Sequence, residues 1–293
     1  MRRPHGEMRW HLLLHLVLIC FTLIAIYPIL WVLALAFSGG QSMMIADLPA
    51  APTLADRLRI VLPWPQALSL KNFIDVLIDE PFGRWLFNSA VVAGATTLLG
   101  VFLACTAAYA FSRFRFPGRR AGMMMFLVSQ MFPGTLMMVP LFIIIVKWLH
   151  LGNTYTGLVL VYAVTAIPFC VWMLKGYFDT IPVEIEESAV MDGATPATIF
   201  FRIVLPLAKP AVAVTALFSF MTGWNEFILA TIFMEEETAY TAPVGLRFFV
   251  GGFTSQWGYF AAGSIIVSLP VVALFYYLQK YLIAGLTAGG VKG

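Results

Sequence analysis

The chain has 293 residues, of which 60% are hydrophobic and only 11% are charged, and its net charge is +3. A soluble domain carries about 25% charged residues. This composition excludes an ordinary water-soluble fold, and lipid is expected to surround most of the surface. Cys20, Cys105 and Cys170 each lie inside an apolar run, which favours packed thiols over a disulfide or a metal site.

Six segments are long and apolar enough to cross a bilayer, which takes about 20 residues. They are Leu12–Phe37, Trp85–Ser112, Ala121–Val146, Leu151–Leu174, Pro210–Met234 and Gly258–Gln279. Glu226 is the only acidic or basic residue other than histidine within them. Several prolines lie in or near these segments and predict a kinked bundle, in which neighbouring helices satisfy the freed carbonyl groups.

The lysines and arginines are distributed unevenly between the two sides of six alternating spans. Twelve of the eighteen lie on the side that includes both termini, and the positive-inside rule therefore predicts cytoplasmic termini. A signal peptide is the alternative for the first segment, because Ala34-Leu35-Ala36 is similar to a cleavage site. The apolar stretch is about twice as long as a signal core of about 7–15 residues, which favours a span.

Two long connections lie on the opposite side of the membrane in this topology. Residues 38–83 are polar and are expected to be partly structured. Residues 235–257 begin with an acidic run and continue with aromatic residues and glycines. A connection this apolar is expected to dip into the bundle or to meet a partner, and packing on its own helices is the alternative.

Motifs of several catalytic and binding classes are absent from the sequence. It contains no GxxxxGK[ST] phosphate loop, no HExxH and no Cys-x-x-Cys. His11 and His15 are four residues apart, but a metal site at the expected membrane edge is disfavoured. We therefore expect no catalytic residue, metal or cofactor on this chain, and an energy source on another chain.

The connection from Asp179 to Pro206 carries signals for a short helical hairpin. Pro182 can open a helix, acidic residues follow in its first turns, and Gly193 can end it. Thr195-Pro196 then predicts a second helix start. By these signals alone, the hairpin is either an ordinary connector or a docking element for a partner.

The spacing of Glu187-Ser188-Ala189, Gly193 and the run Ile203 to Pro206 resembles the EAA motif of ABC importer permeases. Ser188 stands where that family usually has alanine. The resemblance implies that this loop docks into a cleft of a partner ATPase. The residues that it implies for docking are Glu187, Ser188, Ala189, Asp192, Gly193, Ile203, Leu205 and Pro206.

Other runs resemble the carbohydrate-uptake branch of that family. They are Lys71-Asn72-Phe73, Asn88-Ser89, Ala108 to Arg119 and Trp224 to Phe227. The C-terminal run Gly285 to Gly293 is similar to the second-permease group of the maltose/maltodextrin importers. In that group the tail reaches the ATPase interface, which implies such a role for Gly289, Gly290, Val291 and Lys292. The connection 235–257 matches the loop that reaches towards the sugar-binding protein.

The resemblance implies an all-α fold of the type I ABC importer permease kind, with six transmembrane helices in the inner membrane. Residues 1–83 would form the N-terminus, first helix and outer loop, 84–280 the five-helix permease core, and 281–293 the cytoplasmic tail. The implied partners are a sister permease in a heterodimer, two ATPase subunits that hold ATP and Mg, an extracytoplasmic sugar-binding protein and the bilayer. No nucleic-acid partner is expected.

The function that follows is translocation of maltose/maltodextrin-type sugars by a non-catalytic subunit. A permease for another sugar or a polyol is one alternative, and a secondary ion-coupled carrier is another. A carrier would need a coupling-ion site and often shows repeated halves, and neither is visible in the sequence. An intramembrane enzyme would need a facing nucleophile and base, and no such pair stands out.

Trp224, Asn225 and Glu226 are the candidates for the substrate path. Amides and carboxylates bind hydroxyl groups, and an indole can stack on a sugar ring. A charge within the bilayer costs about 2.5–3.5 kcal/mol on insertion scales, so Glu226 is expected to face the bundle or an aqueous path. The alternative is that Asn225 and Glu226 hold helices together or lie near the outer interface.

Overall fold

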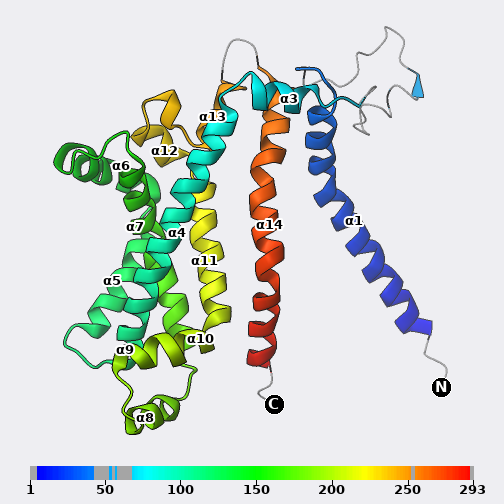
Figure 1. Cartoon of the computed structure of the whole chain (residues 1–293). Coiled ribbons are helices and arrows are strands. Elements are labelled where there is room, and N and C mark those ends of the chain that lie inside the picture. The colour runs from blue at the N-terminus through cyan, green and yellow to red at the C-terminus, as the bar shows by residue number, and fades with distance from the viewer. Residues whose placement is uncertain (1–4, 43–52, 55–56, 58–67, 252–254, 291–293) are drawn as a thin grey trace. The chain divides into compact units, whose positions relative to one another are not determined.

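The computed structural model describes residues 5–42, 53–54, 57, 68–251 and 255–290 (Figure 1). Those residues form helices and no strand. The elements are α1 (His5–Ala36), α3 (Lys71–Ile78), α4 (Phe82–Arg113), α5 (Arg119–Met131), α6 (Gly134–Phe142), η1 (Ile143–Trp148), α7 (Tyr155–Phe178), α8 (Val183–Met191), α9 (Pro196–Ile199), η2 (Phe200–Val204), α10 (Leu205–Leu207), α11 (Lys209–Trp224), α12 (Ile228–Phe233), η3 (Glu237–Ala239), α13 (Ala242–Phe248) and α14 (Trp257–Gly290).

Four of these helices, α1, α4, α7 and α14, are each long and apolar enough to cross a membrane. Two bent helix pairs raise the total to as many as six if each pair is one span. This confirms the predicted all-α membrane fold. The chain divides into two compact units, residues 1–82 with 246–266 and residues 83–245 with 267–293.

The third predicted span, Ala121–Val146, is not one straight helix. Helix α5 stops at Met131, and the next helical segment, Gly134–Trp148, is bent from it by 104°. Phe132 and Pro133 between them have extended backbones, with ψ of 129° and 131°. Proline disfavours a helical conformation in the residue before it and has no N–H to donate, which explains the break.

The fifth predicted span, Pro210–Met234, is interrupted as well. Helix α11 ends at Trp224, and the short helix α12 starts at Ile228. At its other end, α11 is bent by 81° from the segment Pro196–Leu207. The straight part of this span is therefore shorter than the sequence predicts.

Two apolar clusters form the core of the second unit. One joins α4, α5, α7, α11 and the segment around α9 and η2, near the end where α8–α10 lie in Figure 1. The other joins α4, α6, η1, α7, α12 and α13. Helix α7 packs directly on α5, α11 and α12. The elements on either side of both helix breaks are thus fixed to the same central helix.

The connection after α12 folds back onto the start of α4. The Trp85 indole N–H donates to the carbonyl of Glu237 at 2.9 Å. The Asn88 amide donates to the carbonyls of Thr238 and Tyr240 at 3.0 and 2.9 Å. Up to residue 245, this connection therefore packs on helices of its own chain, the alternative that the sequence left open.

Asn72 holds the end of α1 in the first unit. Its buried amide donates to the carbonyls of Leu35 and Ala36 at 3.2 and 3.1 Å, and its oxygen accepts from Gln41 at 2.9 Å. The last carbonyls of a helix have no partner inside the helix, so this asparagine satisfies two of them.

Gly258 provides a test of this arrangement. A Cβ added there would lie 2.1 Å from the Gly40 carbonyl oxygen and 2.6 Å from the Asn72 amide nitrogen. We expect Gly258→Ala to destabilise the protein by about 1–3 kcal/mol, the usual cost of overpacking, measured as a lower melting temperature in detergent. Gly83→Ala is the matched control, because its added methyl group meets nothing within 4 Å. Equal melting of both variants would contradict this packing.

Candidate coupling hairpin and intramembrane cavity

Helix α8 forms the first arm of the segment 179–206, called here the 179–206 hairpin. Glu184 and Glu186 lie in its first turn, where the positive end of the helix dipole stabilises carboxylates. The helix ends at Met191, Asp192 is its C-terminal capping residue, and Gly193 follows with φ of +83°. This left-handed backbone favours glycine, so the helix end predicted at Gly193 is confirmed.

The second arm consists of α9, η2 and α10. The Thr195 hydroxyl accepts the backbone N–H of Thr198 at 3.3 Å, and Pro196 occupies the start of α9. The predicted second helix start is therefore confirmed. Because Pro196–Leu207 is bent by 81° from α11, this arm runs across the end of the second unit (Figure 1).

A buried ion pair joins the hairpin to α4. Glu186 is 7% exposed, and its carboxylate accepts from the Tyr109 hydroxyl at 2.9 Å and pairs with the Arg113 guanidinium. The Nη2 group of the same guanidinium donates to the carbonyls of Phe178 and Ile181, both at 3.0 Å. One arginine therefore connects the end of α4, the end of α7 and the first turn of α8.

This ion pair is not evident from the sequence. There Arg113 is one of several positive charges between the second and third predicted spans, and Glu186 is an acid that the helix dipole favours. Helical spacing in the sequence could have indicated this pair. Glu186 lies three residues before Ala189, so the two share a helix face, and Ala189 is packed against the core. A carboxylate on an inward face needs a paired cation.

Asp179 adds a second link at the same end of α4. It accepts from the Ser112 hydroxyl at 2.7 Å and pairs with Lys175 one helical turn earlier. Burial raises the pKa of Asp179, but the hydrogen bonds from Lys175 and Ser112 and the nearby positive charges outweigh it and hold that pKa below its ordinary value. This link therefore stabilises the fold above the ordinary carboxylate pKa and is lost as the pH falls through the lowered value.

The residues predicted to dock divide by exposure. Those exposed are Glu187, Ser188, Asp192, Gly193 and Pro206, whereas Ala189, Ile203 and Leu205 are half-buried against the core. The motif does not include Val190 and Met191 at the tip, which are 57% and 87% exposed. Apolar side chains gathered on an exposed tip are typical of a surface that a partner covers.

Trp224 and Asn225 end helix α11. Trp224 is 2% exposed, its indole N–H donates to the Val267 carbonyl at 3.1 Å, and its ring stacks on Phe220 with centroids 5.2 Å apart. Asn225 is exposed, and its backbone N–H closes the last turn onto Met221. The structure therefore places the Trp224 ring in the packed interior.

Glu226 caps the short helix α12. Its Oε1 accepts the N–H of Leu229 at 2.9 Å, and its Oε2 accepts the N–H of Ala230 at 3.0 Å and the Tyr162 hydroxyl at 3.2 Å. The first N–H groups of a helix have no partner within the helix. The carboxylate supplies that partner where the span is interrupted.

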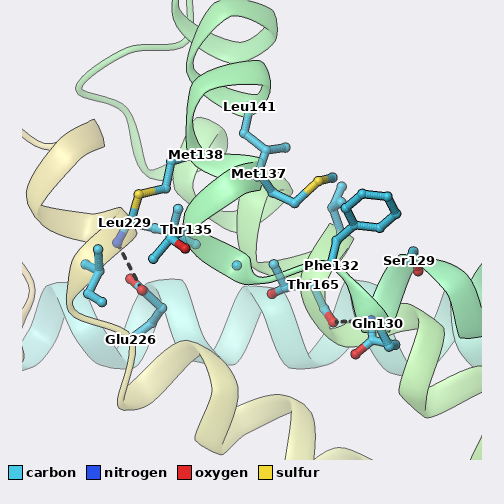
Figure 2. Close-up of a pocket in the computed structure, with 13 residues that line it drawn as sticks. Ser129, Gln130, Phe132, Thr135, Met137, Met138, Leu141, Thr165, Glu226 and Leu229 are labelled. Atoms are coloured by element: carbon cyan, nitrogen blue, oxygen red, sulfur yellow. Dashed lines mark hydrogen bonds between the residues drawn. The ribbon is translucent and has the colours of Figure 1, made fainter.

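A cavity of about 450 Å³ lies where the two interrupted spans meet (Figure 2). Phe132 and Gly134 line it from one break, and Glu226 and Ile228 from the other. Its remaining polar lining comes from Ser129, Gln130, Thr135 and Thr165. Interrupted helices commonly supply the binding groups of transporters, because their free ends present polar backbone inside the membrane.

The predicted tail residues are only partly described. Gly289 and Gly290 end α14, and Val291 and Lys292 lie outside the described residues. In the part of the chain that the structure describes, no group of three or more His, Cys, Asp or Glu side chains is placed to hold a metal ion.

Comparison with solved structures identifies the fold. A chain from the crystal structure of a bacterial ABC transporter involved in the import of the acidic polysaccharide alginate superimposes with a TM-score of 0.80. That match covers 96% of this chain and 99% of the other at 22% identity. This chain therefore shares its fold with a chain of that transporter.

Residues 96–287 match the family described as binding-protein-dependent transport system inner membrane component. The maltose/maltodextrin transport system permease protein MalG of Vibrio vulnificus is 36% identical over 289 residues, with 95% of each chain covered. The galactooligosaccharides transport system permease protein GanQ of Bacillus subtilis is 36% identical over 282 residues, covering 95% of this chain and 94% of the other. The chain belongs to this family of inner membrane permease components.

Removing one partner of the buried ion pair tests the anchoring of the 179–206 hairpin. Glu186→Ala leaves the Arg113 guanidinium without its carboxylate, and losing one member of a buried pair costs about 3–5 kcal/mol. We expect faster hydrogen exchange in α8 and a lower melting temperature. Glu187→Ala is the control, because Glu187 is exposed in the same helix. Unchanged exchange in Glu186→Ala would contradict the anchoring role.

Proposed function

We propose that this chain is the sugar-translocating permease subunit of an ATP-driven importer, with maltose/maltodextrin-type sugars as its substrates. The names of its relatives support this substrate class, since MalG serves maltose and maltodextrin transport and GanQ serves galactooligosaccharide transport. A permease for another oligosaccharide or a polyol is the second candidate. The similarity to GanQ supports it, because GanQ is named for galactooligosaccharide transport.

The observation that carries the proposal is the 179–206 hairpin. It presents an exposed apolar tip at one end of the bundle and is held to α4 by a buried ion pair. A connector that only links two spans needs neither feature. We assign this hairpin to docking on a partner ATPase, with contacts from Glu187, Ser188, Asp192 and Gly193 and with Val190 and Met191 as apolar anchors.

The proposed mechanism is alternating access driven from outside the chain. A binding protein would deliver sugar, and two ATPase subunits would bind and hydrolyse ATP with Mg and move the hairpin. A sister permease would complete the translocation path. The distribution of positive charge predicts that the hairpin, both termini and the tail that we assign to the ATPase interface are all cytoplasmic. ATP can drive such a change only if it favours one of two discrete arrangements.

We assign the cavity at the two helix breaks to the sugar path. Its hydroxyl, amide and carboxylate groups are suited to sugar hydroxyls, and Phe132 offers an aromatic face. Glu226 already accepts three hydrogen bonds from its own chain. It therefore acts chiefly by shaping the cavity, and Gln130 and Thr135 are the better candidates for direct contact.

Substitution of Gly193 tests docking. Gly193→Trp adds bulk at an exposed docking position and also strains a backbone with φ of +83°. We expect it to abolish sugar uptake and sugar-stimulated ATPase activity in proteoliposomes that contain the assembled transporter, while the protein remains in the membrane. Gly193→Asn separates bulk from strain, because asparagine tolerates the left-handed region, and it should retain most activity. Normal stimulated ATPase activity in Gly193→Trp would rule out this docking role.

Thr135 tests the cavity. Thr135→Val keeps the shape of the side chain and removes its hydroxyl group from the cavity wall. The loss of one neutral hydrogen bond, about 0.5–1.5 kcal/mol, predicts a severalfold lower rate of maltodextrin uptake at saturating binding protein. Thr106→Val is the control, because its hydroxyl bonds the Phe102 carbonyl of its own helix at 3.0 Å. Equal rates in both variants would argue against sugar contact at Thr135.

A further inference from the structure

A second cavity, of about 530 Å³, lies where α5 begins beside the end of α7. Its basic lining consists of Arg119, Arg120 and Lys175, and its apolar lining of Phe116, Met123 and Trp172. It is separate in its lining residues from the cavity at the helix breaks. The sugar path and the docking hairpin do not account for it.

The basic half of this cavity carries excess positive charge. Lys175 is paired with Asp179, but no described carboxylate forms an ion pair with Arg119 or Arg120. The Arg119 guanidinium makes a long hydrogen bond, 3.4 Å, to the Ser112 carbonyl, its only one to the described residues. Both arginines lie in the first turn of α5, where the helix dipole also favours an anion.

The other half of the cavity is typical of a membrane interface. The Trp172 indole donates to the Met123 carbonyl at 3.2 Å, and the residue remains 37% exposed. Tryptophan is enriched at the level of lipid headgroups. Exposed apolar side chains, Met124 and Met125 among them, continue along α5 from the same end. A ligand with a charged head and apolar chains fits this division better than a free ion.

We propose that this cavity binds the phosphate headgroup of an anionic phospholipid, with Arg119 and Arg120 as the phosphate ligands and Trp172 at the headgroup level. Basic pockets between helices at the membrane edge are suited to such headgroups. The acyl chains lie along the exposed apolar face of α5. This inference concerns the surrounding lipid and does not depend on which sugar the protein transports.

The test is native mass spectrometry of the full chain, with any co-purifying partners, released from nanodiscs of phosphatidylcholine with 30% phosphatidylglycerol. We expect retained phosphatidylglycerol on the wild type and about 30-fold weaker retention in Arg119→Gln/Arg120→Gln, since each basic residue near an anionic lipid surface contributes about fivefold. Arg115→Gln is the matched control, because Arg115 is exposed in the connection just before α5 but does not line the cavity. It should retain the lipid.

Two further experiments distinguish a lipid from other ligands. Competition by millimolar inorganic phosphate would show a site for a free ion and overturn the lipid assignment. Loss of the lipid when an ATPase subunit binds would place the cavity in a protein interface and also overturn it. If the double variant does not fold, Arg120→Gln replaces it, because the Arg120 side chain is exposed and its removal leaves the packing intact. Equal retention by Arg120→Gln and Arg115→Gln would contradict the proposal.

Discussion

The ion pair between Arg113 and Glu186 is the interaction on which the 179–206 hairpin depends. Two charges taken out of water are expensive unless each finds a partner and further hydrogen bonds. Here the tyrosine hydroxyl and two backbone carbonyls provide those bonds. The hairpin is thereby tied to the end of a span by side chains as well as by covalent connection. In the proposed mechanism, its exposed tip can therefore move with a partner without first unfolding from the bundle.

The two interrupted spans obey a second constraint. Backbone groups freed by a break inside a membrane need partners or a water-filled space. At one break proline removes a donor, and at the other the Glu226 carboxylate accepts two backbone N–H groups. Both breaks border the same cavity. One cavity, lined mostly by apolar side chains and by a few polar groups, therefore borders both irregularities. Glu226, one of its polar groups, is partly a structural requirement of the fold.

The sequence predicts the helical membrane fold, the span positions and both helix starts of the hairpin, because these follow from apolar length, proline and capping residues. It does not predict the interruptions at residues 132–133 and 225–227. The length of an apolar segment cannot distinguish a straight span from a broken one. From the sequence, Glu226 is interpreted as a charge that must avoid lipid and not as a helix-capping residue. The Arg113–Glu186 pair is missed for a related reason. Its members lie 73 residues apart, and neither is unusual locally.

Helix α4 is continuous over 32 residues and contains no proline. Trp85 and Asn88 at its start hold the connection after α12, while Tyr109 and Arg113 at its end hold the 179–206 hairpin. At about 1.5 Å per residue, these anchors are separated by roughly the thickness of a bilayer. The connection after α12 and the 179–206 hairpin are thus anchored at opposite ends of one continuous helix, α4. If one of these two segments moves along the membrane normal, α4 must move the other segment as well. Otherwise the buried hydrogen bonds that anchor the moving segment must break.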